Sequence, residues 1–199
     1  MLKLKKLFSE EELISYQQNF SKSLKSTKPE NTIPLTLDYM RRCQVYAVFD
    51  QNQKMVAGFI LGFTSPFRLL EFIPKDIEIK TVPSFKWEQC CEIVCMWKEP
   101  SIARFEMVQN VWIHIFELFL SSKSQYLLGH NQSTKLSQYY SIIGPTNLYV
   151  GPSIFGLPSQ LFIYPKFKIS ILNKFLVLFY YWLELKKRLK SLAGAKETL

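Results

Sequence analysis

Glu92 is the residue of this sequence best placed to do chemistry. It lies in the middle of residues 90–97, a run of apolar, aromatic and sulfur-containing side chains that predicts a buried central strand. Burial in an apolar setting raises the pKa of a carboxyl group, as a general base acting near neutral pH requires. The alternative is a structural carboxylate at the solvated end of the strand or paired with an arginine.

Four cysteines offer a second kind of chemistry: Cys43, Cys90, Cys91 and Cys95. Their spacing matches neither a disulfide framework nor a zinc site, so we expect reduced thiols and no bound metal. Side chains alternate along a strand with period two, which predicts Cys91 and Cys95 on one face. Buried cysteines usually act as small apolar side chains.

A turn and a long helix follow the predicted strand. Pro100 ends the strand because proline cannot continue a central strand. From Ile102 the apolar residues fall at the three-and-four spacing of an amphipathic helix. Free N–H groups at a helix N-terminus attract anions, and Lys98 and Arg104 stand on either side of this turn. The unit therefore predicts an anion-binding place.

Composition indicates one folded domain with an anionic partner. The 199 residues are 48% apolar, 15% aromatic and 21% charged, and the net charge is +9. Such a charge attracts nucleic acid, anionic lipid, or the phosphates of a cofactor or carrier protein. The basic residues form no recognised DNA or RNA motif, and many aromatics recur at core-like periodicity, which argues against nucleic acid.

The remaining elements alternate strands with helices. An edge strand at 2–8 precedes a helix from the N-cap Ser9 to about residue 25, with Glu12 in capping-box register. A short helix at 35–42 and a hairpin at 44–62 come next, with Gly58 marking a bulge or a close backbone approach. We expect a long loop at 64–87 with a helical turn at 67–72, strands at 125–128, 147–150 and 160–164, and a helix from residue 133 or 134 to Gly144.

The C-terminal part, 169–192, predicts a helix with an apolar stretch at 175–183 and a basic cluster at 186–188. The apolar stretch is shorter than the roughly 20 residues that a membrane span needs. We expect burial in a core or in a homodimer interface. The alternative is a helix lying on an anionic membrane surface through residues 169–192.

The order of elements over about residues 2–164 resembles the GNAT acyltransferase fold. Tyr140-Ser-Ile-Ile-Gly144 resembles the tyrosine-x3-glycine end of the last GNAT helix. Glu92-Ile-Val-Cys95, with Arg68-Leu-Leu and Phe72-Ile-Pro upstream, is similar to acyl-homoserine-lactone synthases and related N-acyl amino acid synthases. The resemblance implies an α/β fold with a GNAT-like mixed central sheet flanked by helices over residues 1–165. The apolar sequence after it predicts an extra C-terminal helix over 166–199.

The resemblance also implies acyl transfer from acyl-CoA or the acyl-phosphopantetheine of an acyl carrier protein to an amine. Glu92 would be the base and Tyr140 the acid that protonates the departing thiolate. Backbone N–H groups of Met96, Trp97 and Lys98 would polarise the thioester carbonyl. The donor would also lie against Ser101, Ala103 and Arg104.

The substrate is expected to contact aromatic and polar residues: Phe59, Phe63, Arg68, Phe72, Trp112 and Asn131. Several of these would line an acyl-chain cavity; the competing interpretation is a plain hydrophobic core. The sequence departs from the family at residues 98–104, where the usual phosphate-binding glycines are missing, and at Val94-Cys95, which replaces a serine-arginine pair.

We therefore interpret the chain as a cytoplasmic acyltransferase without a metal cofactor, with peripheral association to a membrane as the alternative role of residues 169–192. The rival hypothesis is a catalytically inactive GNAT-like module that binds a protein partner or a membrane.

Overall fold

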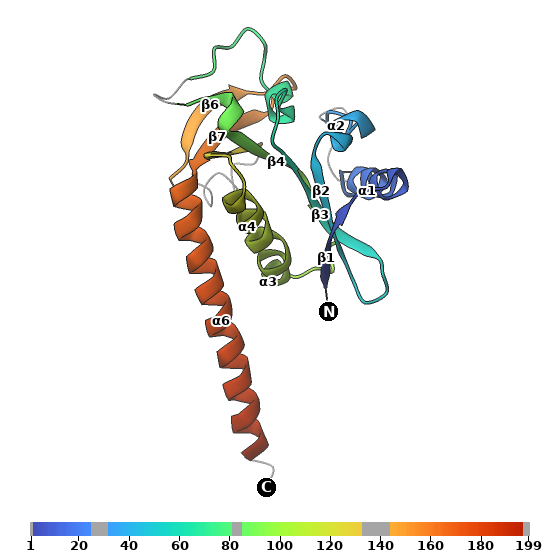
Figure 1. Ribbon diagram of the computed structural model, residues 1–199, viewed down its shortest axis with the longest axis vertical. Coiled ribbons are helices and arrows are strands. Elements are labelled where there is room, and N and C mark those ends of the chain that lie inside the picture. Colours follow the sequence, from blue (N-terminus) through green and yellow to red (C-terminus); the bar gives the residue numbers. More distant parts are fainter. Residues whose placement is uncertain (1, 25–31, 81–84, 133–143, 197–199) are drawn as a thin grey trace.

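A mixed β-sheet organises the computed structural model, which describes residues 2–24, 32–80, 85–132 and 144–196, without the side chains of residues 104, 105, 184 and 187–196. Among these residues, seven strands form one sheet in the order β1-β2-β3-β4-β5-β7-β6. Helices cover both faces of the sheet (Figure 1). This architecture confirms the predicted α/β fold, a mixed central sheet flanked by helices.

The first four strands form an antiparallel block: β1 (Lys3–Leu7), β2 (Gln44–Phe49), β3 (Met55–Gly62) and β4 (Cys90–Lys98). The predicted hairpin is confirmed. Its turn is held by Asp50, whose Oδ1 accepts 2.9 Å hydrogen bonds from the N–H groups of Asn52 and Lys54. The predicted central strand is β4, which occupies the middle of the sheet.

The other three strands form a second antiparallel block: β5 (Tyr126–Asn131), β6 (Thr146–Pro152) and β7 (Pro158–Pro165). Strand β5 is longer than expected. Residues 129–131, which lie beyond the strand predicted at 125–128, continue it because they pair with β7 as far as Asn131 and Gln160. Gly144 has a φ of 64°, the left-handed value expected there, while the helix predicted before it lies outside the described residues.

One face of the sheet is covered by α1 (Glu10–Ser23), α2 (Leu37–Arg41) and two 3₁₀ turns, η3 (Arg68–Phe72) and η4 (Trp87–Gln89). The predicted capping box of α1 is confirmed, since Ser9 Oγ accepts from the Glu12 N–H and Glu12 Oε2 accepts from the Ser9 N–H, both at 3.2 Å. Hydrogen bonds from Lys5, Phe8 and Ser9 lower the pKa of Glu12 to about 2.

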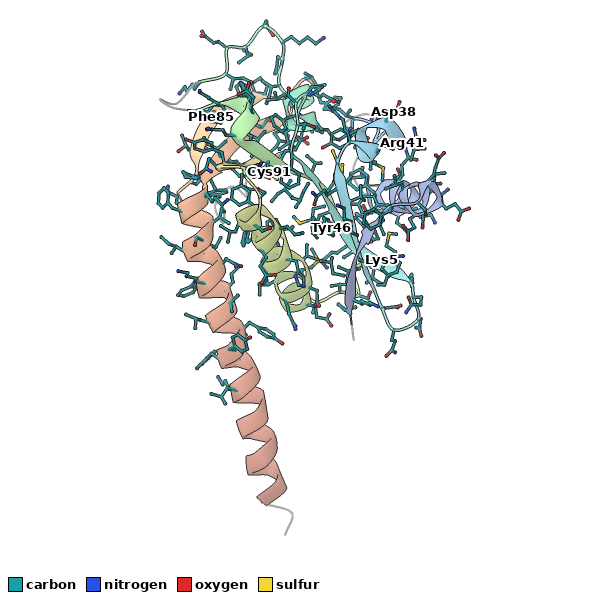
Figure 2. The ribbon with its side chains drawn as sticks, in the orientation of Figure 1. Lys5, Asp38, Arg41, Tyr46, Phe85 and Cys91 are labelled. Carbon is teal, nitrogen blue, oxygen red and sulfur yellow. The ribbon has the colours of Figure 1, made fainter. Side chains whose placement is uncertain are left out.

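The opposite face is covered by one continuous helical run and by the C-terminal helix. The run consists of α3 (Arg104–Met107), the π-helical turn η5 (Val108–Trp112) and α4 (Ile113–Ser121), and it begins two residues later than expected. The C-terminal helix α6 (Lys166–Lys196) packs beside α4 (Figure 1). Cys91, labelled in Figure 2, belongs to the apolar cluster between the sheet and α4.

A bulge in β4 changes which side chains face each cluster. Cys95 has a φ of 51°, and the pairing of β3 with β4 shifts register between Gly58 and Ile60. Cys95 therefore packs with Val94 against the cluster beside α1, whereas Cys91 faces α4. The prediction that Cys91 and Cys95 share a face is wrong because a bulge breaks the period-two alternation.

Burial of α6 on all sides within a core is not what the structure shows. Phe175 and Leu178 are 68% and 67% exposed in the single chain. Within the described chain, none of the helices combines the length and the apolar character that a membrane crossing needs. The division of the chain at residue 165 stays a prediction.

Candidate active site

Glu92 is fully buried in β4 and accepts three hydrogen bonds through its carboxylate. The Tyr39 hydroxyl donates to Oε1 at 2.7 Å, the Arg68 N–H donates to Oε1 at 3.0 Å, and the Leu69 N–H donates to Oε2 at 3.0 Å. Gly62, its partner on β3, makes room for this side chain, because a Cβ there would lie 2.8 Å from Oε1. The strand pair and the N-terminus of η3 thus hold the carboxylate in one position.

Two opposing effects act on the pKa of Glu92. Burial raises it, while the donors from Tyr39 and from the backbone of Leu69 and Arg68 oppose the rise by stabilising the charged form. The net direction is upward, as expected from the apolar sequence around Glu92. A hydrogen-bonded carboxylate with a raised pKa can accept a proton closer to neutral pH than an exposed glutamate can.

Tyr39 separates Glu92 from a pocket at the surface. The pocket has a volume of about 480 Å³, and its lining consists of Ile33, Pro34, Thr36, Asp38, Tyr39, Arg42, Arg68 and Glu71. Burial and the nearby Glu92 charge raise the pKa of Tyr39. The Tyr39 hydroxyl therefore stays protonated and donates a hydrogen bond to Glu92. A molecule in the pocket would therefore approach Glu92 through Tyr39.

Two guanidinium groups lie against the Tyr39 ring. The Arg42 and Arg68 Cζ atoms stand 5.0 and 5.6 Å from its centroid, within the range of cation–π attraction. Arg42 donates to the Pro66 carbonyl at 2.7 Å, and the buried Arg68 donates to the Pro34 carbonyl at 3.0 Å and to that of Ile33. These contacts fix Tyr39, and the pocket wall carries two guanidinium groups beside the carboxylates of Asp38 and Glu71.

The two central strands part directly after Glu92. Strand β4 pairs with β5 in parallel only across Cys90–Glu92, although β4 continues to Lys98 and β5 to Asn131. The bulge at Cys95 lies in the diverging part of β4. Backbone groups of Met96 follow this bulge, whereas Trp97 and Lys98 pair with Gly58 and Ala57 of β3.

The predicted phosphate-binding loop is folded on itself. Lys98 Nζ donates to the Ile102 carbonyl at 2.8 Å, and the Ala103 N–H donates to Glu106 Oε2 at 3.0 Å. A carboxylate thus occupies one of the N–H groups that a pyrophosphate would use. Ser101 and Ala103 are exposed, while the Arg104 side chain is outside the described part.

The predicted substrate residues fall on both faces of the sheet. Phe59, Phe63 and Trp112 lie with Met96 in or against the cluster on the α4 side. Arg68 and Phe72 lie on the other side in η3, and the Phe72 ring stacks on His130 with centroids 4.8 Å apart. The buried Asn131 ends β5. These side chains do not line one shared surface, and Phe59, with no exposed surface, stacks on Tyr46 within the core.

Tyr140, the predicted acid, lies outside the described residues. The thiols are poorly suited to nucleophilic attack, because burial raises the pKa of Cys95 to about 12 and that of Cys43 to about 11. Tyr39 was missed by the sequence analysis. No local signal marks it, since it lies 53 residues from its partner Glu92 and its neighbours only indicate a short helix.

At the level of sequence alone, no family model and no curated protein matches the chain. Solved structures do match its fold. FeeM, an N-acyl amino acid synthase from uncultured soil microbes, is 10% identical, with a TM-score of 0.64 over 88% of this chain and 98% of FeeM.

Two acetyltransferases match over 83% of this chain and 94% of their own. The putative acetyltransferase yncA from Salmonella typhimurium, solved with its cofactor acetyl-CoA, is 9% identical, with a TM-score of 0.55. The ribosomal-protein-S18-alanine N-acetyltransferase from Escherichia coli is 10% identical, with a TM-score of 0.52. The chain therefore has the GNAT acyltransferase fold, and its structural neighbours are acyltransferases and acetyltransferases.

Proposed function

We propose that the protein is an acyltransferase that moves an acyl group from a thioester to an amine, with Glu92 as the general base. The observation that carries this proposal is a buried carboxylate on the central strand, at the point where β4 and β5 part. The GNAT fold of the chain is compatible with this reaction.

The pocket beside Tyr39 is the proposed entrance for the amine. As the amine nitrogen attacks the thioester carbon, it loses a proton to Tyr39 Oη, and the Tyr39 hydroxyl proton passes along its 2.7 Å hydrogen bond to Glu92 Oε1. The carbon–sulfur bond then breaks, and the thiolate takes a proton to leave as a thiol. Tyr140 is the proposed donor of that proton. Tyr39 need not become a free phenolate, which agrees with its raised pKa.

The donor is proposed to be an acyl thioester of phosphopantetheine, carried by CoA or by an acyl carrier protein. The N–H groups of Met96–Lys98 and the turn from Ser101 to Arg104 would meet it. The carboxylate of Glu106 on the Ala103 N–H disfavours a pyrophosphate at this turn, which supports a carrier-bound donor over CoA. The aromatic residues Phe63 and Trp112, beside Met96, would contact the acyl chain.

Thiol release from acyl-CoA and from acyl carrier protein, measured with a panel of amines including amino acids, tests this proposal. Tyr39→Phe removes the relay hydroxyl but leaves the Glu92 carboxylate with its two backbone donors. We expect kcat to fall by about 100-fold or more, the usual contribution of general base catalysis. The expected loss of stability is about 1.5–3 kcal/mol, the usual value of a hydrogen bond to a charged group.

Tyr46→Phe is the matched control. Tyr46, labelled in Figure 2, lies on the α4 side and donates a 2.9 Å hydrogen bond to Gln44 Oε1, so the change removes a similar hydroxyl far from Glu92. Activity should persist in this variant. Equal kcat in wild-type and Tyr39→Phe proteins would refute the relay.

An inactive binding module is the second candidate. Two observations favour it: all the hydrogen bonds of Glu92 join parts of the fold to one another, and the phosphate-binding turn is capped by its own glutamate. Failure of the wild-type protein to release thiol from any donor, together with failure to bind one in calorimetry, would support this candidate.

A further inference from the structure

Helix α6 is attached to the body by one side only. Ile169 is 1% exposed, and Leu172 and Leu176 pack against the cluster beneath α4. Further along, the Gln109 amide of η5 donates a 2.8 Å hydrogen bond to the Tyr180 hydroxyl. The second half of the helix extends beyond the rest of the ribbon (Figure 1).

The opposite side of α6 carries a continuous line of exposed apolar side chains, named here the outer line. Its members recur at alternating steps of four and three residues: Ile171, Phe175, Leu178, Trp182 and Leu185, all between 53% and 68% exposed. At 100° per residue the centre of this line lies about 130° around the helix from the side of Ile169, Leu172 and Leu176, and the line is about 21 Å long. Figure 2 shows side chains of α6 projecting away from the sheet.

The charge of α6 indicates which kind of surface binds the outer line. Residues 166–196 carry eight Lys and Arg against one Glu. Lys174 and Lys186 are exposed beside the line, and Lys186 Nζ stands 5.0 Å from the Trp182 ring centroid. Aromatic side chains next to lysines suit the boundary between acyl chains and anionic headgroups, where the rings enter the boundary and the amines meet phosphate.

A second copy of the chain fits this surface less well. Four-and-three spacing is also that of a coiled-coil seam, in which the residues beside the seam set the pairing. Among the described side chains of α6, the charged ones beside the outer line, Lys174 and Lys186, are both cations, so a second copy would offer them no acidic partner there. We propose that α6 binds the surface of membranes rich in anionic phospholipid, lying along the surface through its outer line.

Sedimentation with vesicles of phosphatidylcholine, with and without phosphatidylserine, tests this inference on the full chain. We expect binding to the anionic vesicles, weaker binding to the neutral ones, and release with rising salt. The variant F175S/L178S/W182S should bind anionic vesicles at least about 100-fold more weakly, because it removes three large apolar side chains from the contact.

Val150→Ser is the matched control, since Val150 is an exposed apolar residue (68%) on β6, away from α6. It should bind vesicles like the wild-type protein. All variants should unfold at the wild-type temperature, because each changed side chain is exposed.

Three results would overturn the inference: no binding of the wild-type protein to anionic vesicles, unchanged binding of the triple variant, or a wild-type dimer in light scattering that the triple variant converts to a monomer. The last would make the outer line an interface between copies. None of these readouts depends on acyl transfer, so this inference and the proposed function can fail separately.

Discussion

The hydroxyl of Tyr16 on α1 donates a 2.8 Å hydrogen bond to the carbonyl of Cys95, the bulged residue of β4. Tyr16 has no exposed surface, and burial raises its pKa, so the phenol remains a donor. The bond joins the first helix to the part of the central strand that diverges from β5. The φ of 51° at a non-glycine residue costs free energy, and this contact helps to offset it.

Tyr16→Phe should therefore weaken the bulge. We expect the free energy of unfolding to fall by about 1–2 kcal/mol, because the Cys95 carbonyl loses its donor in a buried place. Acyl transfer, if the proposed function is correct, should fall as well, since the backbone after Cys95 is proposed to meet the thioester. Urea unfolding and thiol release provide the two measurements.

Tyr149→Phe separates the two effects. The Tyr149 hydroxyl also donates to a carbonyl, that of Pro152 at 2.6 Å, but the bond stays within β6. This variant should lose stability and keep its activity. A Tyr16→Phe protein with wild-type stability would contradict the role given to the Tyr16–Cys95 bond.

Gly62→Ala should displace the carboxylate of Glu92. The new Cβ would stand 2.8 Å from Oε1 and 2.9 Å from Cγ of Glu92, and these atoms are fixed by three donors. We expect a loss of about 1–3 kcal/mol in unfolding free energy, as for other overpacked cores.

The double variant with Glu92→Asp tests the cause, because the shorter side chain vacates the space that the alanine needs. The loss of unfolding free energy in the double variant should be smaller than the sum of the losses in the two single variants. Strict additivity in urea unfolding would mean that Gly62 and Glu92 are not coupled through this contact.

Glu106→Gln should improve the binding of CoA. The amide can still accept the hydrogen bond from the Ala103 N–H, but the change removes a negative charge from the start of the helical run. Calorimetry with CoA should show about three-fold tighter binding, corresponding to roughly 0.6 kcal/mol of relieved repulsion.

Glu117→Gln is the control for net charge, since Glu117 is exposed near the far end of the same run and pairs with His114. It should leave CoA binding unchanged. Equal affinities of all three proteins would show that pyrophosphate does not meet the start of this helical run.

His130 should make stability fall in acid. Burial lowers its pKa to about 4, and its Nε2 lies 2.6 Å from Ser159 Oγ. At pH values between about 6.5, the ordinary pKa of histidine, and 4, His130 is protonated in the unfolded chain but neutral in the folded chain. The stabilisation is therefore complete above pH 6.5 and is lost as the pH falls towards 4, by up to about 3 kcal/mol.

Thermal unfolding of wild-type and His130→Phe proteins between pH 7 and 4 measures this effect. The phenylalanine retains a ring against Phe72 but cannot bind a proton. The variant should show a flatter pH dependence over this range. Parallel curves for the two proteins would assign the acid sensitivity to other groups.

Local signals account for the parts of the fold that the sequence predicted. The capping box at Ser9 and Glu12, the turn at Asp50 and the helical turn at Arg68–Phe72 each depend on residues only a few positions apart. The order of these elements then sufficed to indicate the GNAT fold. Glu92 was placed on a buried central strand because the residues around it are apolar, while its own burial was one of two alternatives.

Tertiary packing decides the features that were missed. A cysteine has no preference for a φ of 51°, so the residues next to Cys95 in the sequence do not predict the bulge. The bulge is stabilised by Tyr16, which lies 79 residues away in the sequence. The partnership of Tyr39 with Glu92 likewise crosses 53 positions. For α6, the apolar sequence predicts a helix but does not distinguish whether its outer side contacts protein, lipid or water.

The short parallel contact between β4 and β5 has a consequence for how the sheet opens. Strand β3 pairs with β2 on one side and with β4 on the other, whereas β4 beyond Glu92 pairs with β3 alone. Backbone with fewer supporting contacts opens at a lower free energy. Amide hydrogens of β2 and β3 should therefore exchange with solvent more slowly than those of β4 beyond Glu92. The proposed catalytic centre would then lie where the sheet opens locally at the lowest free energy.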